Sequence, residues 1–148
     1  MEQLIGDVII LRGLPGIGKT SLAMQLANIA KSHVLAVDDF FTTDGGVYEF
    51  DKEKLQEAYK WNFERFKEAI KNKTPLIIID NTNIKAFHYY HYLDYAQRNS
   101  YRVAIVILPH NDVSDRELSE RSPHGVSKSI IYKMRKEFQW DLDKRKEQ

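Results

Sequence analysis

The amino-acid sequence predicts a three-layer α/β/α fold with a parallel central sheet. Four short apolar runs of strand type recur along the 148 residues, and segments with helical spacing of apolar side chains separate them. Strands that alternate with helices favour a parallel sheet that is covered on both faces. A glycine-rich loop follows the first strand, at the edge where such sheets bind their ligands.

The first strand and the first helix flank the most informative motif of the chain. Residues 8–11, Val-Ile-Ile-Leu, form a continuous apolar run, as expected of a buried parallel strand. Residues 13–20 read GLPGIGKT and match the phosphate-binding pattern G-x-x-x-x-G-K-[ST]. Helical spacing follows at Leu22, Leu26, Ile29 and Ala30. Strand, glycine loop and helix therefore occur in the order that the motif requires.

Each part of this loop meets a physical need of a bound triphosphate. Gly13, Gly16 and Gly18 lack Cβ, so the backbone can wrap closely and direct N–H groups at phosphate oxygens. Lys19 offers a cation to the β- and γ-phosphates, and the Thr20 hydroxyl is a ligand for Mg²⁺. The helix that follows adds its positive dipole end. We therefore predict a nucleotide triphosphate site at Gly13, Leu14, Pro15, Gly16, Ile17, Gly18, Lys19, Thr20 and Ser21.

The second and third predicted strands both run into aspartates. Residues 33–37 predict the second strand, which leads into Asp38 and Asp39, and residues 76–79 predict a buried third strand that ends at Asp80. The carboxyl ends of parallel strands lie at one edge of a sheet, the same edge as the phosphate loop. We therefore expect these aspartates to converge on the nucleotide.

The remaining segments predict helices and one more strand. Asp51 is a plausible N-cap for a helix. The apolar stripe of that helix is Leu55, Tyr59, Phe63, Phe66 and Ile70. Residues 86–98 have a helical pattern, residues 101–108 predict the fourth strand, and Ser114 opens a capping box for a short helix through Arg121. A final amphipathic helix carries Ile130, Ile131, Met134 and Phe138.

The aspartates suggest how the site divides its work. Phosphoryl transfer needs an oriented acceptor hydroxyl, and Asp38 is positioned to accept its proton. Asp39 should point to the opposite side if the strand continues, although an Asp-Asp pair is also an ordinary turn signal. Asp80 is expected to serve the Mg²⁺ site with Thr20, through a bound water or by holding the Thr20 hydroxyl.

The short helix after the fourth strand carries two candidate arginines. Arg116 and Arg121 could cover the transferring phosphates as a lid and neutralise charge in the transition state. The glycine at Gly125 would suit a mobile closing segment. The alternative is surface ion pairing with Glu117 and Glu120, and Arg121 is the better candidate of the two arginines.

Composition excludes several classes of protein. A chain of 148 residues has the usual size of one domain and can bury a core. The absence of cysteine excludes disulfides and thiolate metal sites. No apolar run approaches the ~18 residues of a membrane span, and the N-terminus MEQLIGD lacks the features of a signal peptide. We therefore expect a cytoplasmic protein with no membrane partner.

The charge distribution is less even than the net charge of +1 suggests. Basic residues gather near the C-terminus at Lys128, Lys133, Arg135, Lys136, Lys144, Arg145 and Lys146. Such a surface can contact a phosphate backbone, but a charged terminal helix is more often simply solvated. An aromatic segment, residues 87–95, invites a base-stacking hypothesis, although Tyr89 and Tyr92 share the face expected to pack on the sheet. His88 and His91 lack the third ligand that a metal site would need.

Taken together, GLPGIGKT, VDDFF, IIIDNTNI and the segment ERSPHGV resemble a known family. In this order they are similar to the P-loop polynucleotide 5′-hydroxyl kinases, and especially to compact kinase-like domains of the NEDD4-binding protein 2 type. The resemblance covers residues 8–138 and implies a P-loop NTPase fold, with residues 1–148 as a single kinase-like domain and a lid at about residues 112–127.

The resemblance also implies roles for individual residues. That family transfers the γ-phosphate of ATP to the 5′-hydroxyl of DNA or RNA with Mg²⁺. Lys19 and Thr20 would then serve ATP and the metal, Asp38 would be the general base, and Arg121 would lie in the lid. Phage-type members carry a substrate-gripping arginine three residues beyond the catalytic aspartate, and this chain has Phe41 there.

The leading hypothesis is therefore an ATP-dependent kinase that acts on a hydroxyl of a nucleic acid. A small-metabolite kinase is the second hypothesis, since the chain is short and nearly neutral. A nucleotide-binding module or slow ATPase without a phosphate acceptor is the third, although such a module would not need Asp38. No sequence motif distinguishes ATP from GTP as the donor, RNA from DNA as the acceptor, or one oligomeric state from another.

Overall fold

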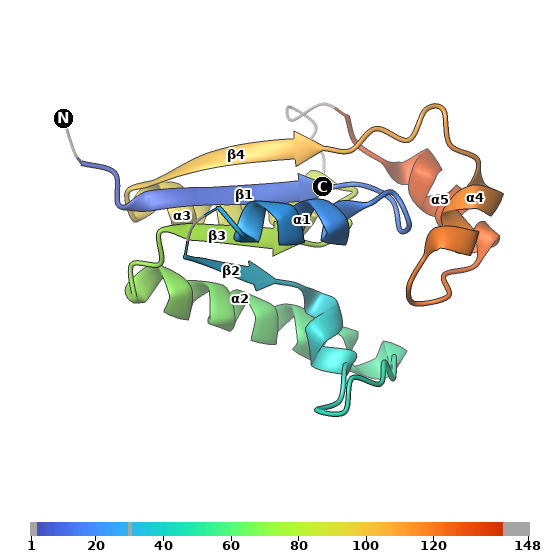
Figure 1. Ribbon diagram of the computed structural model, residues 1–148, viewed down its shortest axis with the longest axis horizontal. Coiled ribbons are helices and arrows are strands. Elements are labelled where there is room, and N and C mark those ends of the chain that lie inside the picture. The colour runs from blue at the N-terminus through green and yellow to red at the C-terminus, as the bar shows by residue number, and fades with distance from the viewer. Residues whose placement is uncertain (1–2, 30, 141–148) are drawn as a thin grey trace.

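The computed structural model describes residues 3–29 and 31–140 and has a four-stranded parallel sheet (Figure 1). The strands stand in the order β2-β3-β1-β4. Their bounds are β1 Gly6–Arg12, β2 Ser32–Leu35, β3 Leu76–Asp80 and β4 Tyr101–Ile107. The helices are α1 Lys19–Ala27, α2 Leu55–Lys71, α3 Ala86–Arg98, α4 Asp115–Arg121 and α5 Lys128–Glu137, with short 3₁₀ helices η1 Val37–Phe41 and η2 Lys52–Lys54. The predicted α/β fold class is confirmed.

Helices cover both faces of the sheet. Alternate residues of β3 point to opposite faces, so Ile77 and Ile79 pack with α2 and α3, whereas Ile78 packs with α1. Figure 1 shows α1 on one side of the strands and α2 with α3 on the other. Because both faces are buried, β3 reads as an unbroken apolar run rather than an alternating one.

The strand register places the phosphate loop beside the end of β3. Leu11 of β1 lies opposite Asp80, so β1 and β3 finish at the same level of the sheet. The Gly13 amide then donates to the Thr82 carbonyl at 3.0 Å, which joins the first residue of the loop to the segment after β3. The convergence of these two strand ends is therefore fixed by backbone pairing.

The helices α4 and α5 lie beyond the carboxyl ends of the strands (Figure 1). They share a second apolar core with the phosphate loop, in which Leu14, Leu118 and Ile131 are fully buried. Ser114 caps α4 by accepting from the Glu117 amide at 3.1 Å, as the capping pattern predicted. The lid segment is thus packed onto the loop that it was expected to cover.

The structure differs in detail from the predicted second strand and from the predicted helix that follows it. The second strand ends at Leu35 instead of residue 37, because the chain turns into η1. Tyr59 is 42% exposed, and Asn62 takes a buried place on α2 by donating to the Tyr92 hydroxyl at 3.0 Å. Asp51 caps η2, which leads directly into α2.

Other predicted features held or fall outside the described residues. The helix predicted at residues 86–98 is α3, and Tyr89 and Tyr92 are buried against the sheet as expected. The first helix ends at Ala27, so Ile29 lies beyond it, and Ala30 is outside the described residues. The basic residues Lys144, Arg145 and Lys146 are also outside them. In the part that is described, no helix has both the length and the apolar character needed to span a bilayer.

Candidate functional site

The loop between β1 and α1 takes a shape that depends on glycine. Gly16 and Gly18 have φ values of 82° and 111°, in the region that side chains with Cβ rarely adopt. At Gly16 space is also closed: a Cβ there would stand 2.2 Å from the Leu118 carbonyl oxygen of α4. The loop therefore owes its path both to left-handed backbone and to close contact with α4.

Lys19 is the cation of this loop, and it is almost entirely buried. Its Nζ donates to the Leu14 carbonyl at 3.1 Å across the loop. Burial lowers the pKa of Lys19 to about 8, against the opposing attraction of Asp80 and Asp38. A phosphate anion in the loop would favour the charged form further, because it would add a negative charge beside a poorly solvated ammonium group.

Thr20 and Asp80 meet at the end of β3. The Thr20 hydroxyl donates to the Asp80 carboxylate at 2.9 Å, which is one of the two arrangements expected for this pair. Burial raises the pKa of Asp80, while the Thr20 hydrogen bond and the Lys19 charge lower it. One hydroxyl and one carboxylate fit Mg²⁺, which is commonly bound by one or two protein oxygens plus phosphate and water. Within residues 3–29 and 31–140, no group of three or more metal-binding side chains occurs, at His88 and His91 or elsewhere.

Asp38 lies on η1, just beyond the end of β2. Its charge acts on Lys19 and on Asp80, and its carboxylate is 53% exposed. The Tyr48 hydroxyl donates to Asp38 Oδ1 at 3.3 Å, and His124 Nε2 stands 3.4 Å from Asp38 Oδ2. Burial first, and then the charge and hydrogen bond of Asp38, raise the pKa of Tyr48 to about 12, so Tyr48 remains a donor.

Asp39 differs from Asp38 in its partner, although the charges of both aspartates raise the pKa of Asp80. Its carboxylate pairs with Arg65 of α2 at 3.2 Å, and the Arg65 guanidinium lies over the Trp61 ring. The two aspartates do point apart, but because η1 is a 3₁₀ helix rather than because the strand continues. Asp39 anchors η1 to α2.

Two asparagines of the segment after β3 form hydrogen bonds to η1 and to β1. Asn81 Oδ1 accepts from the Val37 amide at 2.9 Å, which ties η1 to the end of β3. Asn83, with φ of 48°, donates to the Leu11 carbonyl at 2.8 Å. Lys85 is the N-cap of α3, and its amide donates to His88 Nδ1.

A buried arginine that the sequence reading did not single out supports the same region. Arg12 ends β1, is fully buried and donates to the carbonyls of Asn83, Ile84 and Gln139 at 2.7–3.1 Å. Its guanidinium also lies over the Tyr89 and Phe138 rings. The sequence feature that could have identified Arg12 is its position directly after the apolar run of residues 8–11.

The two candidate lid arginines are engaged on their own helix. Arg116 pairs with Glu120 at 3.0 Å, and Arg121 pairs with Glu117, which is the surface alternative weighed from the sequence. Neither of these contacts involves the phosphate loop. The lid residue that contacts Asp38 is His124, in the Ser-Pro-His-Gly turn. Local spacing gave no signal for this contact.

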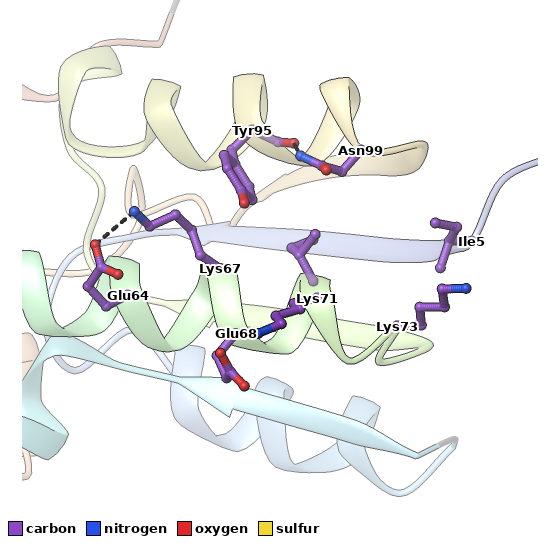
Figure 2. Close-up of a pocket in the computed structure, with 9 residues that line it drawn as sticks. Ile5, Glu64, Lys67, Glu68, Lys71, Lys73, Tyr95 and Asn99 are labelled. Atoms are coloured by element: carbon purple, nitrogen blue, oxygen red, sulfur yellow. Dashed lines mark hydrogen bonds and ion pairs between the residues drawn. The ribbon is translucent and has the colours of Figure 1, made fainter.

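A separate hollow of about 520 Å³ lies at the opposite end of the sheet, between α2 and α3 (Figure 2). Its lining includes Ile5, Lys73 and Asn99, which precede the amino ends of the strands. Lys67 pairs there with Glu64 at 2.7 Å, and no residue of the phosphate loop lines the hollow. The hollow therefore does not belong to the phosphate site.

The fold and the phosphate loop together define a P-loop protein of the kinase-like class. The chain belongs to the AAA domain family (AAA_33), whose model matches residues 8–139. Human NEDD4-binding protein 2 is 40% identical over 137 residues, which cover 89% of this chain. The chain spans only 8% of that protein's length. The family resemblance read from the motifs is thereby confirmed.

Solved structures share the fold at low sequence identity. One chain in the structure of the Pnkp1/Rnl/Hen1 RNA repair complex matches with a TM-score of 0.71 and 19% identity, over 99% of this chain and 47% of that one. A gluconokinase from Sinorhizobium meliloti 1021 matches with a TM-score of 0.58 and 14% identity, over 93% of this chain and 77% of that one. The same fold therefore occurs in a chain of an RNA repair complex and in a gluconokinase.

Proposed function

We propose that this chain is an ATP-dependent phosphotransferase that phosphorylates the 5′-hydroxyl of a nucleic acid. The observation that carries the proposal is the position of Asp38. It is an exposed carboxylate just beyond the end of the neighbouring strand β2, and its charge acts on both Lys19 and Asp80. A protein that only binds nucleotide has no need of a carboxylate on the acceptor side of its phosphate loop.

The donor side would hold ATP through the loop amides and Lys19. Thr20, supported by Asp80, would hold Mg²⁺ there, and the ion would neutralise charge on the phosphate oxygens. Lys19 would stabilise the charge that develops on the β- and γ-phosphates as the bridging bond breaks. Burial of Lys19 favours this role, because a charge in a poorly solvated site acts more strongly on its neighbour.

The acceptor side would use Asp38. The acceptor hydroxyl donates its hydrogen bond to the Asp38 carboxylate, its oxygen forms a bond to the γ-phosphorus, and its proton passes to Asp38. The bond from the γ-phosphorus to the bridging oxygen breaks, and ADP leaves. Tyr48, as a hydrogen-bond donor, would hold the other carboxylate oxygen in place. Arg121 remains the candidate for the lid arginine, and it would exchange Glu117 for the transferring phosphate.

A small-metabolite kinase is the second candidate, and one observation favours it. Residues 38–51 carry five carboxylates and no lysine or arginine: Asp38, Asp39, Asp44, Glu49 and Asp51. An acidic acceptor side repels a polyanion and would suit a neutral alcohol better. A slow ATPase without an acceptor is the third candidate.

An acceptor panel separates these candidates. The protein, γ-labelled ATP and Mg²⁺ would be incubated with 5′-hydroxyl RNA and DNA oligonucleotides, nucleosides and sugar alcohols. We expect label on an oligonucleotide. Label on a small alcohol alone would support the metabolite kinase, and phosphate release without any labelled acceptor would support the ATPase.

The Asp38→Asn variant tests the acceptor-side base. We expect transfer to fall by roughly 10²–10⁴-fold, while ATP affinity stays close to that of wild type, because Asp38 serves the acceptor. Asp44→Asn is the matched control, since Asp44 is an exposed carboxylate of the same segment without a contact to the loop. Normal transfer by Asp38→Asn would refute the assignment.

A further inference from the structure

Three rings stand beside Asp38 and form what we call the acceptor platform: Tyr48, Phe50 and His124. Tyr48 stacks on His124 with ring centroids 3.9 Å apart and planes inclined by 24°. Phe50 is nearly parallel to Tyr48, at 15° and 6.5 Å. Because Tyr48 and His124 both contact the Asp38 carboxylate, the rings lie directly next to the proposed acceptor position.

The acceptor platform is held from beneath but open above. Phe41, which is only 5% exposed, packs under it with its ring 5.0 Å from that of Phe50, whereas Phe50 itself is 52% exposed. A tight turn fixes the segment, because Thr43 donates to Val47 at 2.8 Å and Glu49 donates to Phe41 at 2.7 Å. A large exposed ring that is packed on a buried ring can stack with a flat ligand.

The negative charge of the residues around the acceptor platform limits the kind of ligand that can bind there. The segment that carries Tyr48 and Phe50, residues 38–51, has five carboxylates and no lysine or arginine. A phosphodiester would be repelled at this position, while a nucleobase is neutral and stacks on any aromatic face. The grip on an acceptor would therefore come from its base and not from its backbone.

We propose that the acceptor platform binds the nucleobase of the nucleotide that bears the reacting hydroxyl. This inference rests on the proposed function and deepens it, because it assigns the residues that select the acceptor. The base adds to the row of rings, and its sugar hydroxyl then falls beside Asp38. Phe41, buried below, supports the rings without touching the substrate.

The test compares matched acceptors. Wild-type protein would be given short 5′-hydroxyl oligonucleotides that carry either a normal or an abasic terminal unit. We expect the abasic acceptor to raise KM by roughly 5–150-fold, the range of one lost stacking contact, with little change in kcat. Phe50→Leu should raise KM for the normal acceptor in the same way and erase the difference between the two acceptors, while Phe50→Tyr, which keeps the ring, should not.

Phe87→Leu is the matched control, because Phe87 is a similarly exposed ring, 47% accessible, on α3. Equal KM values for normal and abasic acceptors in wild type would overturn the proposal. So would a Phe50→Leu variant, checked for wild-type unfolding temperature, that still prefers the normal acceptor.

A binding measurement keeps this inference separate from the proposed function. An oligonucleotide with 2-aminopurine as its 5′-terminal base would be titrated with the protein in the absence of ATP. Quenching that Tyr48→Leu and Phe50→Leu abolish would support the acceptor platform even if no oligonucleotide were phosphorylated. Transfer to oligonucleotides without any quenching would leave the proposed function standing and overturn the platform.

Discussion

Gly16 of the phosphate loop packs closely against helix α4. Its backbone has a positive φ, and the carbonyl of Leu118 on α4 fills the space where a Cβ would be. The glycines of this motif are usually explained by the approach of phosphate. Here Gly16 also lets α4 pack directly on the loop.

Replacing Gly16 by alanine should separate these two effects. Gly125→Ala is the control, because Gly125 also has positive φ, 64°, but open space around it. We expect Gly125→Ala to cost about 1 kcal/mol of unfolding free energy through backbone strain alone. Gly16→Ala should cost about 1–3 kcal/mol more through overpacking against α4. Urea unfolding of the two variants measures the difference, and equal losses would contradict the role assigned to Leu118.

At the scale of elements, the start of α3 is built on a neutral histidine. The Lys85 amide donates to His88 Nδ1 at 3.2 Å, so the ring must present a lone pair. Burial lowers the pKa of His88 to about 4, and the positive charges of Lys85 and Arg12 add to this effect. The first turn of α3 thus depends on a ring that carries no charge.

Stability should therefore fall as the pH is lowered through this window. Unfolded histidine has a pKa near 6.5, so between about pH 6.5 and 4 the unfolded chain binds a proton that the folded chain does not. We expect His88 to account for a loss of about 2 kcal/mol across that range, after allowance for partial exposure.

The His88→Asn variant isolates this contribution, because asparagine can still accept from the Lys85 amide. Denaturant unfolding at pH 7 and pH 5 should show a smaller loss in the variant than in wild type. His91 and His110 also have lowered pKa values and are present in both proteins, so their effects cancel. Identical pH dependence of the two proteins would rule out the proposed role.

The elements differ in how far the sequence predicted them. The phosphate loop, the helix at residues 86–98 and the Ser114 cap were confirmed, because each depends on a local pattern of glycines, apolar spacing or a capping side chain. The path of η1 was not predicted, since its tie from Val37 to Asn81 joins residues that are distant in sequence. The contact of His124 with Asp38 was missed for the same reason.

At the scale of the whole molecule, Arg12 joins three parts of the chain. It ends β1, and its guanidinium donates to carbonyls after β3 and to Gln139, which is 127 residues away. Gln139 in turn donates to the Ile84 carbonyl at 2.8 Å and accepts from the Ala86 amide. The strand that carries the phosphate loop is thereby tied to the segment that follows α5.

Loss of this cation should destabilise the fold. In Arg12→Met the side chain would still fill much of the volume, but the carbonyls of Asn83, Ile84 and Gln139 would each lose a hydrogen bond, and among the described residues only the Ile84 carbonyl would keep another, from the Gln139 amide. We expect a loss of about 3–5 kcal/mol of unfolding free energy. Arg102→Met is the control, because Arg102 is an exposed arginine paired with Asp7, and its loss should destabilise the fold far less. Urea unfolding measures both, and similar small losses would show that the buried contacts contribute little.

The position of η1 separates the residues proposed to select the acceptor from the phosphate loop. The phosphate loop follows β1 in the middle of the sheet, whereas Asp38, Tyr48 and Phe50 follow β2, a four-residue strand at the margin. Side chains of the marginal part can be exchanged without altering the packing beneath the loop. Under the proposed function, substitutions within residues 40–50 would therefore change which alcohol is accepted, while the phosphate loop is left intact.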